Sequence, residues 1–466
     1  MYYLKRFFFV FLTFMWLSIA AQNHFIKGKV TGILNNLVYL SSYSGDKTMI
    51  VDSANINSSG IFCFNLKSSL QPGLFKISLG KSLKDEFYGG NGQDNFLNLI
   101  YNNENIEFTT NIVNPIDSIR IIESKENQLY FKFMERDKQL NLQMELLIQM
   151  KNNFPKTDKL YPSLKNRYDE LQQEHKNYTL SMIEKNPGTY ISHIIKVFNY
   201  TKLDFDLPAN ARSQYMIDHY FDPIDFSDTL LLHSDVYTSK TMAYLKFVSK
   251  FEMMKNKNQT DIYIKIVDKL MTASQINDKV NKQIRDFLIH GFEIMHNDAV
   301  LTHIYETYVK ENTCSDDNQV SGLKRRVDGA KLLATGNKAP EITFIGTSSQ
   351  TTKLSQINTA KTVVIFWASW CPHCRQTLPE LKKMYDGQQE KKFEVVAVSI
   401  DTNKTSYDQV VQEGKFNWIN QCDLKGWNGI AGDYFVYETP TLFLLDREKK
   451  IIAKPLSLDE LNSMLK

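Results

Sequence analysis

Two cysteines near the C-terminus, Cys371 and Cys374, constrain the fold of this chain more than any other feature. They follow a continuous apolar run, Val363 to Phe366, as expected of a strand that is covered on both faces. A helical pattern begins directly after them, with apolar residues on one face at Leu378, Leu381 and Met384. The first cysteine is therefore predicted to lie at the end of a strand, at or just before the start of a helix.

This position favours redox chemistry. The free backbone N–H groups and the dipole at a helix start stabilise a negative group, and a thiolate is one. Two intervening residues place the second cysteine one turn later, so the two sulfurs can close a small, reducible ring. The pattern therefore predicts a redox-active pair, Cys371 and Cys374.

Other uses of a Cys-x-x-Cys pair are disfavoured by the rest of the sequence. A zinc site needs two further ligands at suitable spacing. Cys422 stands alone, and His290, His296 and His303 are six and seven residues apart in another region. A purely structural disulfide across so short a loop would constrain the unfolded chain very little. We therefore expect no metal and no cofactor other than the cysteine pair.

Residues 339–466 resemble the thioredoxin fold, and within it the TlpA/ResA-like thiol–disulfide oxidoreductases of bacterial envelopes. The combination of motifs is specific. It consists of Ala339-Pro340, Phe366-Trp367-Ala368-Ser369-Trp370-Cys371-x-x-Cys374-Arg375, Pro379, the strand Val395 to Ser399, and Tyr434-x-x-x-x-Thr439-Pro440-Thr441-Leu442-Phe443-Leu444.

The resemblance implies a central sheet flanked by helices, with a cis Pro440 facing the cysteines. It implies that Cys371 is the attacking or attacked sulfur and that Cys374 resolves the mixed disulfide. The backbone of Thr439, with Pro440 and Trp370 beside it, would bind the substrate. The implied partners are protein thiols and disulfides of the envelope and a membrane electron-transfer protein.

The residues between the two cysteines leave the redox direction open. The resemblance favours a reductant, including a role in cytochrome c maturation. Pro372 and His373 instead match the strongly oxidising DsbA-type enzymes, in which a histidine stabilises the thiolate and makes the pair a better oxidant. The two residues are therefore candidates for redox tuning, and a DsbA-like oxidase or isomerase is the alternative function.

Two acids that such enzymes often carry are missing here. The residue before the Phe-Trp pair is Ile365, and the residue three positions after the second cysteine is Thr377. Deprotonation of Cys374 then needs solvent, His373 or Glu380.

The start of the chain has the pattern of an export signal. Lys5 and Arg6 precede an uncharged stretch from Phe7 to Ala21, which is shorter than the roughly 20 residues that span a bilayer. Residues 1–21 are predicted to be a signal peptide, so the mature protein belongs in the periplasm. An uncleaved signal is the one way in which we expect it to contact the membrane.

The region between the two ends divides by pattern. Residues 22–115 show short alternating runs with turn residues between them, which predicts a small antiparallel β-sandwich-like domain. Residues 116–335 are predicted to form an all-α domain, and residues 336–466 the α/β thioredoxin-like domain. Within the α region we expect a helix from Tyr161, with its aromatic seam in the core, and a single long helix over 260–295.

Charge and the remaining cysteines add further constraints. The chain has 55 basic and 52 acidic residues without long like-charge runs, so no basic stripe for nucleic acid is visible. Cys63 is expected in the core, and Cys314 is the more exposed. Cys422 is expected on a connecting segment as a packing residue, with a third redox thiol as the alternative. A second class of function remains open: residues 22–335 could form a binding module for an envelope partner or carbohydrate, with an accessory redox domain.

Overall fold

The computed structural model describes residues 24–33, 37–80, 95–198, 201–254, 258–310, 318–345, 351–388 and 392–465. The predicted signal peptide and Cys314 lie outside these residues. The chain divides into two compact units, Met1–His290 and Gly291–Lys466, and each is described by itself. The boundary falls within helix α8 (Asp278–Ile294), so the second unit includes the end of the region expected to form the α domain.

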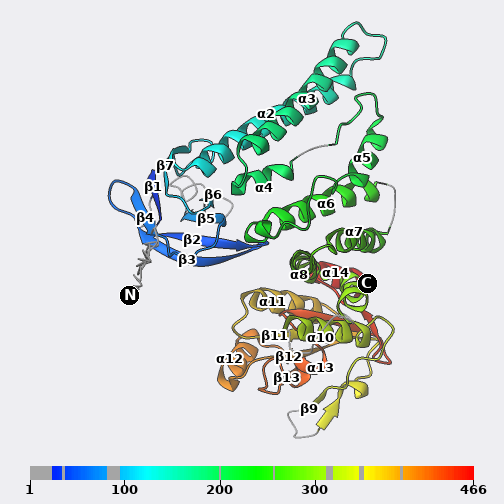
Figure 1. The fold of residues 1–466 in the computed structure, drawn as a ribbon. Helices are drawn as coiled ribbons and strands as arrows, with labels where there is room; N and C mark the ends of the chain where they lie inside the picture. The colour runs from blue at the N-terminus through cyan, green and yellow to red at the C-terminus, as the bar shows by residue number, and fades with distance from the viewer. Residues whose placement is uncertain are drawn as a thin grey trace, which may run out of the picture. The chain divides into compact units, whose positions relative to one another are not determined.

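The first unit begins with two four-stranded sheets (Figure 1). One sheet has the order β4-β1-β7-β8 and the other the order β3-β2-β5-β6. The bounds are β1 (Phe25–Thr31), β2 (Leu37–Ser44), β3 (Lys47–Asn55), β4 (Ile61–Asn65), β5 (Gly73–Gly80), β6 (Asn95–Tyr101), β7 (Ile106–Asn111) and β8 (Arg120–Glu123). Both sheets contribute to one apolar core, which confirms the sandwich-like class. The pairing is not wholly antiparallel, because β1 and β7 run parallel.

The prediction for Cys63 was wrong. Alternation along β4 turns Phe62 and Phe64 into the core and leaves Cys63 exposed on the opposite face. The aromatic rings were the stronger determinant of which face is buried, because a ring removes more apolar area from water than a thiol does.

Helices follow the sheets. They are α2 (Lys125–Lys151), α3 (Tyr161–Lys185), α4 (Tyr190–Lys196), α5 (Ala209–Asp218), the 3₁₀ turn η1 (Thr229–His233), α6 (Val236–Met253), α7 (Gln259–Ser274) and α8. Helices α2 and α3 lie side by side as a long hairpin (Figure 1). The seam of α3 is buried, including Tyr161, Leu164 and Tyr168, which confirms its core role.

The expected single helix over 260–295 is two helices. The break lies at residues 275–277, where the side chain of Asn277 accepts hydrogen bonds from the backbone N–H groups of Lys279 and Val280. An asparagine in this position stabilises a helix start. A new helix therefore begins after Asn277, and α7 ends at Ser274.

The second unit contains the end of α8, α9 (Asp298–Ile304), a π-helical turn (Tyr305–Val309) and α10 (Asn318–Leu332), followed by an α/β domain. Its five-stranded sheet has the order β13-β12-β11-β14-β15. The strands are β11 (Lys361–Trp367), β12 (Phe393–Ser399), β13 (Ile419–Cys422), β14 (Thr441–Leu445) and β15 (Ile451–Ala453). The helices are α11 (Pro372–Asp386), α12 (Lys404–Gly414), α13 (Ile430–Asp433) and α14 (Leu458–Leu465). A short pair, β9 (Thr343–Ile345) and β10 (Thr351–Lys353), and the turn η3 (Leu354–Gln356) precede the sheet.

Strand β11 lies at the centre of this sheet and is covered on both faces. It pairs in parallel with β12 and antiparallel with β14. Its residues from Thr362 to Trp367 are all buried, as the continuous apolar run predicted. The thioredoxin fold expected for this part of the chain is confirmed.

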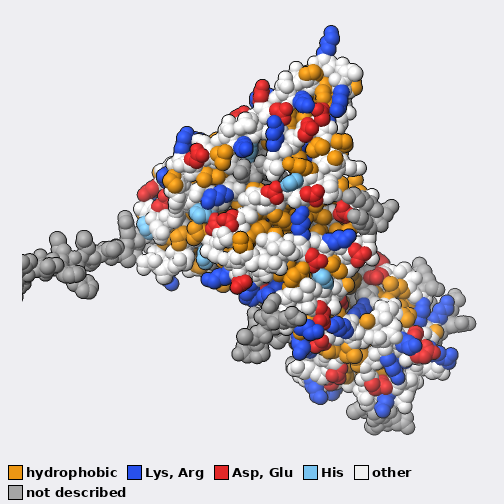
Figure 2. Space-filling model, turned by 45° about the vertical axis from the view of Figure 1, so that its right-hand side comes forward, with side chains coloured by type: hydrophobic (Ala, Val, Ile, Leu, Met, Phe, Trp, Pro, Cys, Tyr) orange, Lys and Arg blue, Asp and Glu red, His pale blue; other side chains and the backbone are white. Residues whose placement is uncertain are grey.

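Two properties of the surface and helices bear on function. On the face shown in Figure 2, basic and acidic side chains are interspersed, as the nearly balanced composition predicts. Within the described ranges, no helix has both the length and the apolar character needed to cross a membrane.

Candidate redox site

Cys371 lies where the sequence predicted it, at the start of α11. It is the N-cap residue, and its sulfur accepts a hydrogen bond from the backbone N–H of Cys374 at 3.3 Å. Pro372 occupies the first helical position, where its missing N–H costs no hydrogen bond. The local sequence therefore fixes both the helix start and the direction in which the sulfur faces the free N–H groups.

A second loop approaches this sulfur from β14. The Thr439–Pro440 peptide is cis, as the resemblance implied. The thiol of Cys371 donates a hydrogen bond to the Thr439 carbonyl oxygen at 3.3 Å. The structure thus brings Cys371, Cys374 and the Thr439–Pro440 peptide together from segments far apart in the chain. Trp370 lies next to Cys371 and is 61% exposed.

The two thiols differ in environment. They are unpaired, and Cys371 is 5% exposed whereas Cys374 is fully buried. Burial opposes ionisation of Cys371, but hydrogen bonds from the Cys374 thiol and from neighbouring donors outweigh it and lower the pKa of Cys371. Burial, and then the hydrogen bond with Cys371, raise the pKa of Cys374. Cys371 is therefore the sulfur that ionises first, and Cys374 keeps its proton.

The residues proposed for tuning and proton transfer lie mostly at the surface. The side chains of His373 and Glu380 are exposed, and His373 acts on the pKa of Cys371 through its backbone N–H. The Thr377 hydroxyl donates to the His373 carbonyl oxygen at 2.9 Å. Ile365 is fully buried in β11. No buried carboxylate therefore occupies either position in which such enzymes often carry one.

Sequence reasoning missed Asp401, a buried carboxylate that holds the loop leading to Cys371. Asp401 is 1% exposed and accepts hydrogen bonds from the Ser369 N–H at 2.9 Å, the Ser369 hydroxyl at 2.7 Å and the Ser399 hydroxyl at 2.6 Å. The signal that could have found it is its place just after β12, because polar residues at the carboxyl ends of parallel strands lie beside functional loops. Asp401 positions Ser369, two residues before Cys371.

Helix α10 packs against the loop that leads to the cis peptide. A Cβ at Gly329 would lie 2.5 Å from the Phe435 ring, so only glycine allows this approach. Phe435 itself has φ = +48°, which is uncommon for a non-glycine residue. The guanidinium carbons of Arg325 and Arg326 lie 5.8 and 5.6 Å from the centre of the Tyr437 ring. The end of the helical region thus borders the Thr439–Pro440 loop directly.

The turn after α8 reaches the same loop. His296 has φ = +51° at the position after a helix where glycine is usual, and Asn297 N donates to the Phe292 carbonyl in the corresponding 6→1 bond. The His296 side chain lies 3.3 Å from the Glu438 carboxylate, next to Thr439. Both side chains are exposed to solvent, so this contact contributes little to stability by itself.

Cys422 is not on a connecting segment but ends the edge strand β13. It is half-buried, and its thiol donates to the Asp401 carbonyl oxygen at 3.3 Å. Burial raises the pKa of Cys422, which disfavours its use as a third redox thiol.

A dithiol at a helix start, facing a cis-proline loop on this sheet, defines a thiol–disulfide oxidoreductase of the thioredoxin fold. Comparison with known proteins agrees. Residues 335–454 match the AhpC/TSA family, and residues 206–328 match a domain of unknown function, DUF5106. The thioredoxin-like protein YneN of Bacillus subtilis is 32% identical over 120 residues, covering 26% of this chain and 69% of that protein. The chain therefore belongs to the thioredoxin-like thiol–disulfide oxidoreductases.

Two further similarities concern an enzyme and a solved structure. The thiol-disulfide oxidoreductase ResA of Oceanobacillus iheyensis is 28% identical over 153 residues, covering 31% of this chain and 77% of that protein. A crystal structure of a thioredoxin-like protein from Bacteroides caccae covers 57% of this chain and 96% of its own, with 20% identity and a TM-score of 0.44.

Proposed function

We propose that the protein is exported through its first 21 residues and reduces disulfides of periplasmic proteins with the Cys371–Cys374 dithiol. Support comes from the signal-like pattern of residues 1–21, from relatives named thiol-disulfide oxidoreductase ResA, and from the site geometry. A role of the cytochrome c maturation type, in which apoprotein cysteines are kept reduced, follows from the same resemblance.

The reaction begins at the more acidic sulfur. The Cys371 thiolate attacks one sulfur of a substrate disulfide, a mixed disulfide forms, and the other substrate sulfur leaves as a thiolate that takes up a proton. Cys374 then loses its proton and attacks Cys371, which releases the second substrate thiol and leaves the Cys371–Cys374 disulfide. The substrate is reduced by two electrons, and a dithiol of a membrane electron-transfer partner restores the enzyme.

The binding surface follows from the contact between Cys371 and Thr439. The Thr439 carbonyl already accepts a hydrogen bond from the Cys371 thiol, so it lies within reach of a chain joined to that sulfur. We propose that Thr439 pairs with the substrate backbone, while Pro440 and the exposed Trp370 contact residues beside its cysteine.

The environment of Cys371 influences whether the pair acts as a reductant or as an oxidant. The dominant influences on the pKa of Cys371 are burial, which opposes ionisation, and hydrogen bonds, which favour it. The His373 imidazole is exposed, so water screens its interaction with the sulfur. These hydrogen bonds favour the reduced form and so move the pair towards the oxidising side, but by less than a cation held against the sulfur would. The reductant role is therefore supported chiefly by the relatives named ResA.

The equilibrium reduction potential of the pair tests this proposal. We expect a glutathione titration to give a value near the thioredoxin end of the range, about −270 mV, and Cys371→Ser to abolish the couple. A value near the DsbA end, about −120 mV, would instead assign the protein as an oxidase or isomerase. Absence of a reversible couple would favour a binding protein with an accessory thioredoxin-like domain.

A further inference from the structure

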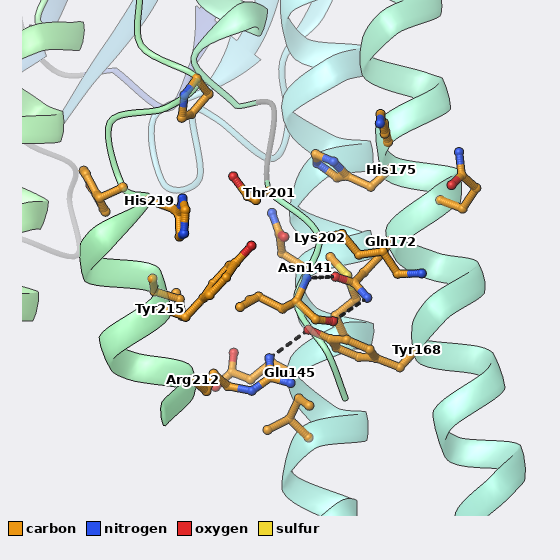
Figure 3. A pocket seen from close by; sticks show the side chains of 18 of the residues that line it. Asn141, Glu145, Tyr168, Gln172, His175, Thr201, Lys202, Arg212, Tyr215 and His219 are labelled. Carbon is orange, nitrogen blue, oxygen red and sulfur yellow. Dashed lines mark hydrogen bonds between the residues drawn. The ribbon is translucent and has the colours of Figure 1, made fainter. Parts of the chain in front are cut away.

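A cavity of about 490 Å³ lies in the first unit between α2, α3, α5 and α6, at a distance along the chain from the redox site. This volume falls in the range of small-molecule sites. Figure 3 shows Arg212 and Tyr215 on α5 and His219 directly after it, across the cavity from residues of α2 and α3. The connection through Thr201 and Lys202 closes one side.

The walls are apolar and aromatic, and their rings are held in place. The Tyr168 hydroxyl accepts a hydrogen bond from Arg212 at 2.8 Å, and the guanidinium lies 5.3 Å from the ring centre. The rings of Tyr215 and His219 lie 4.3 Å apart. Between the rings the wall is completed by Met144, Ile148, Val197, Leu203, Met216 and Pro223. Such walls suit the apolar body of an organic ligand.

The charges that line the cavity are predominantly positive. Glu145 is the one carboxylate among the described lining residues, whereas the cations are Lys176, Lys202, Arg212 and Lys240. Arg212 is partly occupied by Tyr168 and by the Asp204 carbonyl, and Lys202 lies 3.9 Å from Asp169. The charge balance of the lining favours an anion.

Lys240 is a half-buried cation of the lining. Its ammonium lies 4.6 Å from the centre of the Phe198 ring. The nearby Asp137 carboxylate is already bound by His175 at 2.7 Å and by Asn141 at 2.9 Å. In the described part of the chain, no carboxylate lies within ion-pair distance of Lys240. Burial lowers the pKa of Lys240, which shows the cost of keeping this charge without a close anion.

We propose that this cavity binds an organic anion, with its apolar body between the aromatic walls and its acidic group at Lys240. The inference goes beyond the redox function and does not depend on it. A carboxylate or sulfonate would supply the counter-charge that Lys240 lacks, in a site where water screens the interaction only partly.

A pair of matched probes tests the proposal on the purified protein. 1-Anilinonaphthalene-8-sulfonate and N-phenyl-1-naphthylamine share a flat apolar body, and only the first carries an acid. We expect the sulfonate to bind more tightly, and Lys240→Met to weaken its binding about tenfold without changing that of the neutral probe. Lys246→Met, on an exposed position of the same helix, should change neither.

Further variants locate the probes and exclude misfolding. Tyr215→Ala should weaken both probes, because it removes part of the aromatic wall. Replacing a half-buried ammonium that lacks a close carboxylate by an apolar side chain of similar length should not lower the unfolding temperature. Equal binding of the two probes, or equal effects of Lys240→Met and Lys246→Met, would overturn the proposal. Reduction of a disulfide substrate by the same variants reports separately on the redox site.

Discussion

The strands β11 and β12 have buried polar groups at both of their ends, and the two ends use them differently. At the amino ends, Glu394 accepts hydrogen bonds from Tyr385 at 2.8 Å and from the Val395 N–H at 2.9 Å. The Lys449 ammonium donates to the hydroxyl of Thr362, which pairs in register with Glu394. Thr362, Glu394 and Lys449 are buried, so these bonds satisfy polar groups inside the fold.

At the carboxyl ends, the corresponding acid is Asp401, and its bonds extend to a reactive atom. Ser369 is fixed by Asp401, Trp370 follows at the surface, and Cys371 begins α11. Both acids satisfy buried donors, so both stabilise the fold. We therefore expect Asp401 to affect the chemistry at Cys371 and Glu394 to affect stability alone.

The largest expected contrast is between the two thiols of the redox end. Because the pKa of Cys371 is lowered and that of Cys374 is raised, iodoacetamide should alkylate Cys371 at neutral pH more than about 100-fold faster than Cys374. The rate at Cys371 should rise with pH and level off below about pH 8.5, where an ordinary cysteine is half ionised. Peptide mass spectrometry identifies the labelled residue, and faster labelling of Cys374 would reverse the assigned roles.

The two acids give a direct test of the comparison. Asp401→Asn and Glu394→Gln should each lower the free energy of unfolding by about 1.5–3 kcal/mol, because each weakens charged hydrogen bonds. Only Asp401→Asn should also slow disulfide exchange by the folded protein, by roughly tenfold or more, since the loop before Cys371 loses its anchor. Urea unfolding and insulin reduction measure the two effects. An equal loss of activity in Glu394→Gln would show that the distinction between the ends is wrong.

Two glycines on α10 extend the test to the cis-proline loop. Gly329→Ala places a methyl group against Phe435, whereas a Cβ at Gly322 meets no atom of the described residues within 4 Å. Both substitutions gain helix propensity, up to about 1 kcal/mol. Overpacking should offset this gain in Gly329→Ala alone, at a cost of about 1–3 kcal/mol.

The activity readout for these variants is the rate of insulin reduction relative to the unmodified protein. We expect a loss of a few-fold for Gly329→Ala, since the loop that carries Thr439 must move, and no loss for Gly322→Ala. If the rates of the two variants agree, the contact of α10 with this loop is structural only.

The smallest expected effect concerns His373. Because its imidazole is exposed and its backbone N–H acts on Cys371, His373→Ala should shift the reduction potential by less than about 30 mV. A larger shift of the potential towards about −270 mV would show that the imidazole is the dominant influence on the potential. The unmodified protein would then be better described as an oxidising enzyme.

The elements found from the sequence are those with local signals. The apolar run of β11, Cys371 at a helix start and the seam of α3 each depend on residues within a few turns. The cis-proline loop came from resemblance, because no local pattern links Thr439 to Cys371.

What the sequence missed depends on partners that are distant in the chain. Asp401 acquires its role from Ser369, and Gly329 from Phe435, so neither residue is distinctive within its own segment. Cys63 and the break at Asn277 were predicted wrongly for a different reason, because two local preferences compete at each place. In β4 the phenylalanines rather than Cys63 take the core face, and at Asn277 the helix-start preference outweighs the continuing apolar pattern.

The position of β1 in its sheet has a consequence for the order of folding. Although it is the first strand, β1 lies between β4 and β7, and Ile26 pairs with Ile106, eighty residues later. In a chain that emerges N-terminus first, β1 therefore cannot pair with β7 until residues 106–111 have also been synthesised. Contacts of such long sequence separation form slowly, so we expect the nascent β region to expose apolar surface during synthesis.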